Sequence, residues 1–504
     1  ESKESKTHVT GGVIPASSAP GISREPVSVG SLTHTEQLLF LHEAFLADLE
    51  CRGYGISHMH ATIPDFIPNA ETFLAERHAR QYLEKVRAEE KGPATDEGSK
   101  AKPKGQQDID INPDLPKDTR DKLQSLFEEF PIVSDRPGLA KDYEVTVEIK
   151  PGATPHASAP RGRGRAESEI ILRWARKMLD SGEYQLAPQN CKWASAIHLV
   201  GTFNGDGSLK KVRATGDYRQ VNERLVHVAP ETPNLKRIQN AARGKKYYAT
   251  LDVKGAFNNL RLSPQAMEIF AVRTPLGLIV PTRAPFGPTN MPSKWQRYIL
   301  GILKDLKGFG RLFWVYADDI VIACDKLDEL YRVIRQILQA LANNGITLGA
   351  GKVRIGYPSA IVLGALLSSE GMSPNPDHIA ALDRIRYPES GKEIQRLLGF
   401  FGYFSDFIPN FQTYAAKVRQ YQDKGARKKF ARPLPEHARE AIDHLKGVLR
   451  ANPVLHPFDA DLQLFIDTDA SQYGVGAVAY QMREGKKCPI AFFSKTLSPA
   501  QQRW

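Results

Sequence analysis

Two adjacent acids, Asp318 and Asp319, lie between two apolar runs at residues 312–315 and 320–323. These runs predict two buried strands joined as a hairpin, and the tip of the hairpin would present the carboxylates. A carboxylate buried without a partner is costly, so a cation is the natural companion of such a tip. An ordinary hairpin turn is the alternative, because Asp tolerates turn geometry.

A third acid, Asp252, ends another apolar segment at residues 247–253, and Gly255 permits a tight departure of the chain after it. A strand that pairs with the predicted hairpin would bring Asp252 beside Asp318. Three oxygen donors at one point suit Mg²⁺, which prefers octahedral oxygen coordination. Two such ions could activate an attacking hydroxyl and stabilise a leaving oxygen, so the constellation predicts nucleotidyl transfer.

The composition indicates a large folded protein with a basic region. Of the 504 residues, 41% are hydrophobic and 25% are charged, and this length predicts about three domains. Residues 1–110 contain 12 Lys and Arg against 17 Asp and Glu, whereas the whole chain has a formal net charge of +11. Residues 111–504 are therefore a candidate polyanion binder. A basic surface that only keeps the protein soluble is the alternative.

Several classes of protein and site are excluded by the sequence. No apolar stretch is long enough for a membrane span and the first residues are too polar for a signal peptide, so an intracellular protein is expected. The four cysteines lie far apart without a CxxC pair, which excludes a disulfide scaffold and a zinc finger. The triplet at residues 180–182 spells Asp-Ser-Gly, as in aspartic proteases, but it follows a helical segment and only one such loop is present.

The spacing of apolar residues predicts an α+β protein, because strands and helices interleave irregularly. Strands are expected at residues 143–149, 196–200, 247–253, 312–323 and 462–480. Helices are expected at residues 35–49, 70–88, 117–130, 168–179, 293–306 and 327–344, and within 392–449. The first 30 residues are expected to be disordered, and residues 89–107 read as a solvated linker.

A series of short motifs then occurs in one order along the chain. The motifs are WAS at 193–195, TGDYRQVN at 215–222, LDVKGAF at 251–257, APFGPTNMP at 284–292, YADD at 316–319, LG at 363–364, LGFFGYF at 398–404, FIPNF at 407–411 and DTDAS at 467–471. Over about residues 114–504 the sequence resembles the polymerase of gypsy-type LTR retrotransposons, a reverse transcriptase followed by a connection and the start of an RNase H domain.

The resemblance implies a right-hand polymerase fold and the following domains. An N-terminal region at 1–88 of unassigned role and a linker at 89–113 precede fingers and palm at 114–376, a thumb or connection at 377–458 and a truncated RNase H-like α/β domain at 459–504. Asp469 would be the first metal-binding acid of that last domain. Since one carboxylate cannot hold two metal ions, no nuclease activity is expected from this chain alone, and both ends are expected to be cuts in a longer polyprotein.

By the same resemblance, Asp252, Asp318 and Asp319 are the metal-binding acids of the palm, with Mg²⁺ as the expected ion and Mn²⁺ as a substitute. Phe257 matches the steric gate, a rigid ring that excludes a ribose 2′-hydroxyl, and a core-packing Phe is the alternative. Arg213 matches the fingers arginine that grips the triphosphate of the incoming nucleotide.

Further residues are assigned by their place in the pattern. Residues 201–207 replace the family's lysine-rich strand, so Lys210 or Lys211 would serve in its stead. Lys352 falls where the family has a lysine that protonates pyrophosphate, or it is a solvated surface lysine. Gln296 either contacts the template or is an exposed helical residue. Four residues resemble the family's hairpin that holds the primer terminus: Leu363, Gly364, Met372 and Ser373.

Two other features complete the comparison. The basic RGRGR segment at 161–165 either contacts a nucleic-acid backbone or is an ordinary exposed loop. Ala317 stands where the family usually has Leu or Met, and Met291 stands where Ala is common.

The leading hypothesis is an RNA-directed DNA polymerase that also copies DNA, adding deoxynucleotides to a primer on an RNA or DNA template. The parent polyprotein would supply a protease, the remaining RNase H and an integrase, and the protein would be cytoplasmic, in virus-like particles. A decayed, non-catalytic nucleic-acid binder is the alternative. A group II intron or telomerase-like polymerase is disfavoured, because neither is expected to carry the segment at 398–411 and an RNase H start.

Overall fold

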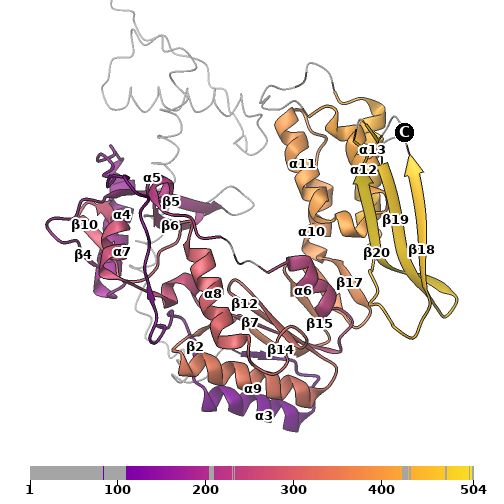
Figure 1. The fold of residues 1–504 in the computed structure, drawn as a ribbon, viewed down its shortest axis with the longest axis horizontal. Helices are drawn as coiled ribbons and strands as arrows, with labels where there is room; N and C mark the ends of the chain where they lie inside the picture. Colours follow the sequence, from indigo (N-terminus) through magenta and orange to yellow (C-terminus); the bar gives the residue numbers. More distant parts are fainter. Residues whose placement is uncertain are drawn as a thin grey trace, which may run out of the picture. The chain divides into compact units, whose positions relative to one another are not determined.

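The computed structural model describes residues 83, 109–203, 209–229, 231, 233–422, 430, 433–471, 474–498 and 500–501 (Figure 1). The disordered segment, helices and linker predicted before residue 108, Leu83 apart, lie outside these residues, as do the side chains of Lys210 and Lys211. The chain divides into two compact units, and the smaller unit contains residues 162–173 and 199–214. Within the described residues, no helix is both long and apolar enough to cross a membrane.

A five-stranded sheet carries the predicted acids of the larger unit. In spatial order its strands are β1 (Ile109–Ile111), β14 (Val353–Tyr357), β7 (Tyr247–Asp252), β12 (Asp319–Cys324) and β11 (Phe313–Tyr316). β11 and β12 form an antiparallel hairpin, and β12 pairs antiparallel with β7. The strands expected at 247–253 and 312–323 are therefore confirmed.

Three amphipathic helices pack beside this sheet: α3 (Lys117–Glu129), α8 (Met291–Leu303) and α9 (Leu327–Asn343). Helix α9 contacts β12 and β7, α8 contacts β11, and α3 contacts α9 (Figure 1). The buried residues of α9 recur every three or four positions, namely Leu330, Val333, Ile334, Ile337, Leu338 and Leu341. Asp328 and Glu329 in its first turn favour the positive end of the helix dipole. These three helices confirm the periodicity-based predictions.

A second sheet contains β4 (Tyr184–Leu186), β10 (Gly277–Pro281), β9 (Val272–Thr274), β5 (Ser195–Phe203) and β6 (Leu209–Gly216), in that order. In the larger unit, Ser195 and Ala196 of β5 pair with β9. In the smaller unit, partly buried Leu199 and Val212 pack against a core cluster made of Leu83, Ala166 and Ile170. In the larger unit, β4 and the first residues of β5 thus pair with β10 and β9, which come much later in the sequence.

Short elements connect these sheets. They are β2 (Val133–Ser134), β3 (Glu144–Val145), α4 (Arg165–Asp180), α5 (Arg219–Arg224), η2 (Ala256–Asn259), β8 (Arg261–Leu262), α7 (Pro264–Ile269) and β13 (Leu348–Gly349). The strand predicted at 143–149 is wrong in length, because β3 pairs there with β8 and the only other pairing in this range is an isolated bridge between Ile149 and Leu225. The Asp-Ser-Gly triplet at 180–182 lies at the end of α4, where Gly182 has a φ of 71°. It is a helix terminus, as the sequence analysis holds.

The segment that follows consists of a small sheet and a helical core. The sheet contains β15 (Ser359–Val362), β16 (Ala365–Ser368) and β17 (Gly371–Pro374). The helices are α6 (Leu235–Ala242), α10 (Pro376–Ala381), η3 (Leu382–Arg384), α11 (Gly391–Tyr403), η4 (Ser405–Phe407), α12 (Phe411–Arg419) and α13 (Glu436–Arg450). Helix α11 begins after Ser390, whose Oγ accepts a hydrogen bond from the Glu393 N–H at 3.3 Å. One core cluster joins these elements through buried residues such as Phe401, Phe404 and Leu445.

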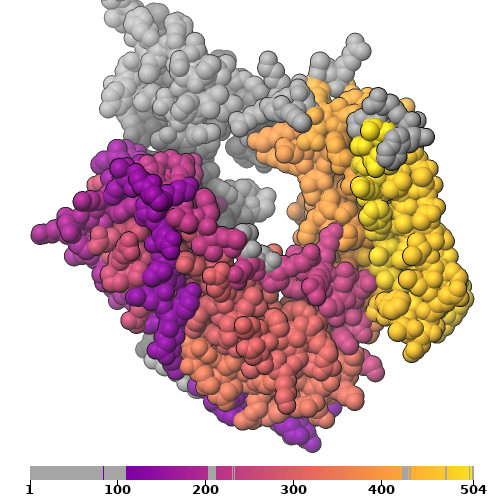
Figure 2. All heavy atoms as spheres, in the orientation of Figure 1, coloured from indigo at the N-terminus to yellow at the C-terminus, as the bar shows by residue number. Residues whose placement is uncertain are grey.

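The last sheet is an antiparallel meander of β18 (Leu464–Ser471), β19 (Gly474–Arg483) and β20 (Lys486–Thr496). Figure 2 shows these strands, in yellow, lying against the orange helical segment. The Gln412 N–H of α12 donates to Ser494 Oγ at 2.9 Å, and Asn410 Nδ2 lies 3.4 Å from Asp469 Oδ2. The strand-like pattern predicted at 462–480 is confirmed as β18 and β19.

Candidate active site

The pairing of β12 with β7 brings two of the predicted acids together. Asp319 and Asp252 are directly opposite each other in the antiparallel register. The Val253 N–H donates to the Asp318 backbone carbonyl at 2.8 Å, so the pairing extends to the hairpin tip. The prediction that a neighbouring strand brings Asp252 beside the hairpin is confirmed. Asp318 is the exposed member of the trio, whereas Asp252 and Asp319 are half-buried.

The hairpin tip is held in an unusual conformation by helix α8. Ala317 has a φ of 52°, a left-handed value that costs a residue with a Cβ about 1 kcal/mol or more. Its N–H donates to Gln296 Oε1 at 2.9 Å, and its carbonyl accepts from Trp295 Nε1 at 2.8 Å. Two consecutive side chains of α8 therefore satisfy both backbone groups of Ala317. An ordinary turn would carry Gly or Asn at this position, without such support.

This arrangement corrects one prediction about Gln296. Its side chain is buried, with 3% of its surface exposed, so the alternative of an exposed helical residue is wrong. Template contact by Gln296 stays a prediction. Trp295, fully buried beside it, is missed by the sequence analysis. Nothing in its spacing distinguishes Trp295 from an ordinary core residue, because the partner is a backbone carbonyl 22 positions along the chain.

The three carboxylates influence one another electrostatically. The pKa of Asp319 is raised to about 6, mainly by burial and then by the negative charges of Asp318 and Asp252. Lys352 opposes the effect: its Nζ lies 3.0 Å from Asp252 Oδ1 and 2.9 Å from Oδ2. Although 63% of the Lys352 side chain is exposed, it is an ion-pair partner of the acids and not merely a solvated surface lysine. A Cβ added at Gly349 would lie 3.2 Å from Asp252 Oδ1, a contact tight enough to press on this carboxylate.

The oxygen donors fit a hard divalent cation, but they are not yet gathered as ligands. Among the residues that the structure describes, no three Asp, Glu, His or Cys side chains converge as a metal site. The three aspartates nevertheless share one end of the sheet, and their mutual repulsion favours a cation between them. Carboxylate oxygens are the ligands that Mg²⁺ and Mn²⁺ take in proteins.

Phe257 follows the acid-bearing strand by one tight turn. Gly255, with a φ of 55°, starts the turn, and η2 carries Phe257. The Phe257 ring is half-buried and packs on the ring of Phe286, with 5.2 Å between ring centroids and 54° between their planes. Phe286 is 53% exposed. Phe257 is thus not a fully enclosed core residue, in contrast to the alternative weighed from the sequence.

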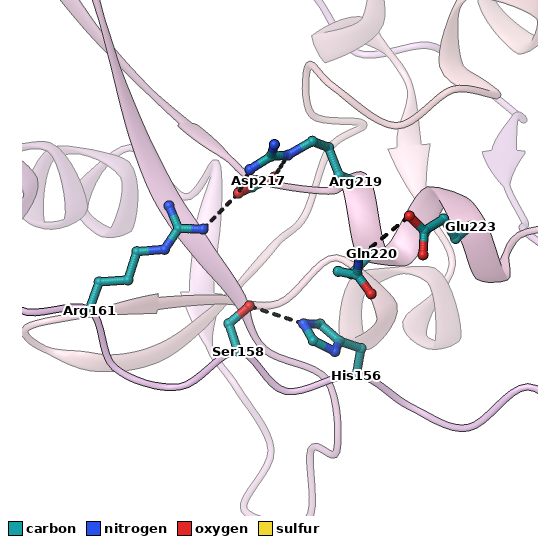
Figure 3. Close-up of polar contacts among 7 residues, drawn as sticks. All are labelled: His156, Ser158, Arg161, Asp217, Arg219, Gln220 and Glu223. Atoms are coloured by element: carbon teal, nitrogen blue, oxygen red, sulfur yellow. Dashed lines mark hydrogen bonds and ion pairs between the residues drawn. The ribbon is translucent and has the colours of Figure 1, made fainter. Parts of the chain in front are cut away.

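A second polar group lies in the larger unit around Asp217, shown in Figure 3. Arg219 donates from Nε to Asp217 Oδ1 and from Nη2 to Oδ2, each at 2.8 Å, and Arg161 Nη2 donates to Oδ2 at 2.8 Å. The hydrogen bonds from Arg219, followed by that from Arg161, hold the pKa of Asp217 well below its usual range. Side-chain exposures are 12% for Asp217, 45% for Arg161 and 81% for Arg219. Arg161, the first residue of the RGRGR segment, is therefore held by an ion pair within an exposed loop, and its contact with a nucleic-acid backbone stays a prediction.

The remaining predicted residues lie elsewhere. Arg213 is exposed on β6 in the smaller unit. In the larger unit, Leu363 and Gly364 form the turn between β15 and β16. Met372 and Ser373 are on β17, where their side chains are buried, with 3% and 7% of their surfaces exposed.

Comparison with known families decides what these elements are. Residues 204–397 match the family model described as "Reverse transcriptase (RNA-dependent DNA polymerase)". The chain contains a reverse transcriptase domain. Residues 434–504 match the model "RNase H-like domain found in reverse transcriptase", which here covers α13 and the meander of β18 to β20. The reverse transcriptase domain includes the three aspartates, Phe257 and Lys352.

Retrotransposon polyproteins are relatives of this chain. The retrovirus-related Pol polyprotein from transposon opus of Drosophila melanogaster is 26% identical over 420 residues, covering 79% of this chain and 40% of the relative. That from transposon 297 is 29% identical over 322 residues, covering 64% and 29%. The transposon Tf2-3 polyprotein of Schizosaccharomyces pombe is 26% identical over 291 residues, covering 58% and 21%. The chain thus spans less than half the length of these curated relatives.

Solved structures confirm the predicted α+β polymerase fold. A foamy viral protease-reverse transcriptase, solved in complex with double-stranded DNA, has a TM-score of 0.66 at 19% identity, covering 77% of this chain and 67% of that chain. A foamy viral protease-reverse transcriptase in complex with an RNA/DNA hybrid has a TM-score of 0.65 and covers 77% and 51%. At this identity the likeness concerns the fold alone.

Proposed function

We propose that the reverse transcriptase domain acts as an RNA-directed DNA polymerase, which also copies DNA, and adds deoxynucleotides to a primer 3′-hydroxyl. The observation that carries the proposal is the direct pairing of Asp319 with Asp252, next to the exposed Asp318 at the tip. Such a pairing gathers negative charge at one end of a sheet. Two-ion phosphoryl transfer needs this arrangement of carboxylates.

Asp252, Asp318 and Asp319 would hold Mg²⁺, or Mn²⁺ in its place, with Asp252 and Asp318 as the most direct ligands. When bound, the divalent cations supply the charge that activates the primer hydroxyl and stabilises the departing pyrophosphate. Lys352 now neutralises Asp252 and would be free to move toward the leaving group once the carboxylate has another partner. In that position its ammonium group could donate a proton to the leaving oxygen.

Nucleotide selection is assigned to residues outside the acids. The half-buried ring of Phe257, braced by Phe286, would lie under the sugar and exclude a ribose 2′-hydroxyl by steric clash. The triphosphate would be gripped by Arg213 and by Lys210 or Lys211, since guanidinium and ammonium groups pair well with phosphate.

Template and primer would contact other parts of the chain. Arg161 and Arg219 keep unused donors while Asp217 fixes their guanidinium groups, which supports contact with phosphates of the template strand. Gln296 would contribute to the template side, and the hairpin with Leu363, Gly364, Met372 and Ser373 would hold the primer terminus. Asp469 would be a metal-binding acid of the RNase H-like part. Within the parent polyprotein, a protease, the rest of RNase H and an integrase would accompany this chain, in cytoplasmic virus-like particles.

Primer extension tests the proposal. The purified chain is given a DNA primer annealed to an RNA template, four deoxynucleoside triphosphates and Mg²⁺. We expect extension by the wild-type chain and a loss of at least about 100-fold in Asp318→Ala. Asp325→Ala is the matched control, because Asp325 follows the opposite end of β12 and pairs with Lys245. Equal extension by Asp318→Ala would contradict the assigned site, and binding without incorporation under either metal would favour the non-catalytic alternative.

A further inference from the structure

The turn between β15 and β16 has a geometry that requires outside support. Val362 and Ala365 pair across it, so Leu363 and Gly364 form a two-residue hairpin connection. Both have a positive φ, 49° for Leu363 and 85° for Gly364. Two-residue turns of this kind favour Asn-Gly, and a Leu in the left-handed region is strained by about 1 kcal/mol or more.

Side chains from two separate helices provide the support. Gln239 of α6 is buried, with 5% of its surface exposed, and its Nε2 lies 3.1 Å from the Val362 carbonyl oxygen and 3.2 Å from that of Leu363. Tyr403, the last residue of α11, donates its hydroxyl to the same Leu363 carbonyl oxygen. Any Cβ at Gly364 would clash with the Tyr403 hydroxyl. The Leu363 carbonyl oxygen thus accepts hydrogen bonds from side chains of two helices, α6 and α11, and Gly364 packs directly against Tyr403.

The turn that Tyr403 supports and the catalytic hairpin pack against the same hydrophobic core. Tyr316 precedes the strained Ala317 and pairs with Asp319. Tyr316 and Leu363 both pack against the core cluster of the α11 segment. Trp314 of β11 belongs to this cluster, as does Phe401 of α11, the helix that carries Tyr403. Helix α11, the Leu363–Gly364 turn and the catalytic hairpin are therefore joined through one hydrophobic core.

We infer that Gln239 and Tyr403 are positioning residues, which fix the Leu363–Gly364 turn relative to the catalytic hairpin and thereby set the location of the primer 3′-end. This inference rests on the proposed function, in which that turn holds the primer terminus. Neither side chain touches the reacting atoms. The effect on the reaction is geometric, because a reacting hydroxyl displaced by about 1 Å loses on the order of 100-fold in rate.

Two variants remove the hydrogen bonds and retain the volume: Tyr403→Phe and Gln239→Met. The first measurement uses a primer with 2-aminopurine at its 3′-end, bound to its template, in an Asp318→Ala background. The fluorescence reports the surroundings of the terminal base without any need for catalysis. We expect each variant to change this fluorescence while the Kd for template–primer changes by less than about twofold.

The second measurement is single-nucleotide addition in the active chain. We expect the maximal rate to fall by about tenfold in either variant, with KM for the nucleotide unchanged, because the primer end is displaced and the nucleotide site is not. The double variant should lose less than the product of the two single losses, since both side chains hold one carbonyl. Tyr387→Phe is the matched control, because Tyr387 donates its hydroxyl to Asp443 on α13 and not to the Leu363 carbonyl.

The outcomes separate the two claims. Unchanged 2-aminopurine fluorescence in both variants would overturn the inference, as would equal effects of Tyr387→Phe. A lower melting temperature with a parallel loss of binding would also contradict it, because a purely structural role would then be sufficient. If the wild-type chain fails to extend any primer, the proposed function fails, yet the fluorescence measurement still decides whether these side chains position a bound primer end.

Discussion

Asp319 and Asp252 face each other across two antiparallel strands, as a directly paired set of carboxylates. Sheets rarely tolerate this, because like charges opposite one another are destabilising. Burial and the two neighbouring acids raise the pKa of Asp319 to about 6, while Lys352 offsets part of the repulsion at Asp252. At neutral pH and without a cation, the site is therefore a source of instability built into the sheet.

Asp319→Asn should stabilise the chain in a pH-dependent manner. The pKa of Asp319 is raised in the folded state, so its favourable contribution is present below about pH 4 and is lost as the pH rises through about 6. Asn carries no charge at any pH. In EDTA at pH 7 we expect the variant to melt about 2–4 °C above wild type, with a smaller difference at pH 4.5.

The control for this measurement has the opposite sign. The hydrogen bond from Tyr357, followed by Arg354, lowers the pKa of Asp110, so its contribution is lost as the pH falls. Asp110→Asn should therefore lower the melting temperature at pH 7 and have less effect at acidic pH. A difference between Asp319→Asn and wild type that does not vary with pH would contradict the electrostatic explanation.

Lys352→Met should change how the chain responds to Mg²⁺. Lys352 occupies both oxygens of Asp252, so a cation that binds this carboxylate must displace the ammonium group. We expect the Mg²⁺ concentration for half-maximal primer extension to fall by about two- to fivefold, and the maximal rate to fall as well if Lys352 donates a proton. A titration of extension rate against Mg²⁺ measures both. Lys245→Met, which breaks the ion pair with Asp325, should alter neither.

Gln296→Leu should destabilise the tip of the catalytic hairpin. The Ala317 N–H would lose its acceptor, and Ala317 already has a strained left-handed φ. Leaving this donor without a partner costs about 1–3 kcal/mol of folding free energy. We expect the displaced Asp318 to raise the activation free energy of primer extension by a comparable amount. Thermal unfolding and primer extension measure the two effects. Gln336→Leu is the control, because Gln336 is only half-buried and its Nε2 lies 3.3 Å from the Lys307 carbonyl oxygen. Similar losses in both variants would contradict the role of Gln296.

Much of the catalytic sheet could be predicted from the sequence, because its signals are local. The apolar runs on each side of Asp318 and Asp319 are continuous and short, and β7 is also mostly apolar, so buried strands that end at the acids are expected. The structure pairs β7 and β12 antiparallel. Strand β14 is short, and Gly356 interrupts it at a register shift. The alternation of apolar and polar residues in β14 is therefore too weak to predict a strand.

Contacts between distant side chains could not be predicted in the same way. Arg161 and Asp217 are separated by 56 positions, and Gln239 and Leu363 by 124. Such contacts depend on how whole elements pack, and each residue taken alone reads as an exposed charge or a polar helix position. The burial of Gln296 is a similar case, since only the strained Ala317 explains why an amide is needed inside the core.

Arg161→Ala should weaken nucleic-acid binding mainly at low salt. Its guanidinium is fixed by Asp217 beside that of Arg219, and together they present positive charge to a phosphate backbone. We expect the slope of log Kd against log salt to decrease by the amount that one phosphate contact contributes. Fluorescence anisotropy with a labelled template–primer at several salt concentrations measures this slope. Arg335→Ala is matched in exposure, 46% against 45%, and in having a carboxylate partner, Glu129; an equal change in that control would contradict a specific contact.

Phe257→Ala should allow ribonucleotides into the growing strand. The ring is half-buried and packs on Phe286, so it is held rigidly one turn after the acid-bearing strand, where a sugar could lie against it. Removal of the ring opens space for a 2′-hydroxyl, and steric exclusion of one hydroxyl is worth on the order of 10- to 100-fold in selectivity. The ratio of kcat/KM for a deoxynucleotide and the matching ribonucleotide is the quantity to measure.

The control is Phe286→Ala, which removes the partner ring and leaves Phe257 in place. If Phe257 itself is the barrier, this variant should lose part of the discrimination through a less constrained Phe257 ring, but less than Phe257→Ala does. If both variants lose discrimination equally, the pair acts as one aromatic wall. If neither does, the 2′-hydroxyl is excluded elsewhere, and the role assigned to Phe257 is wrong.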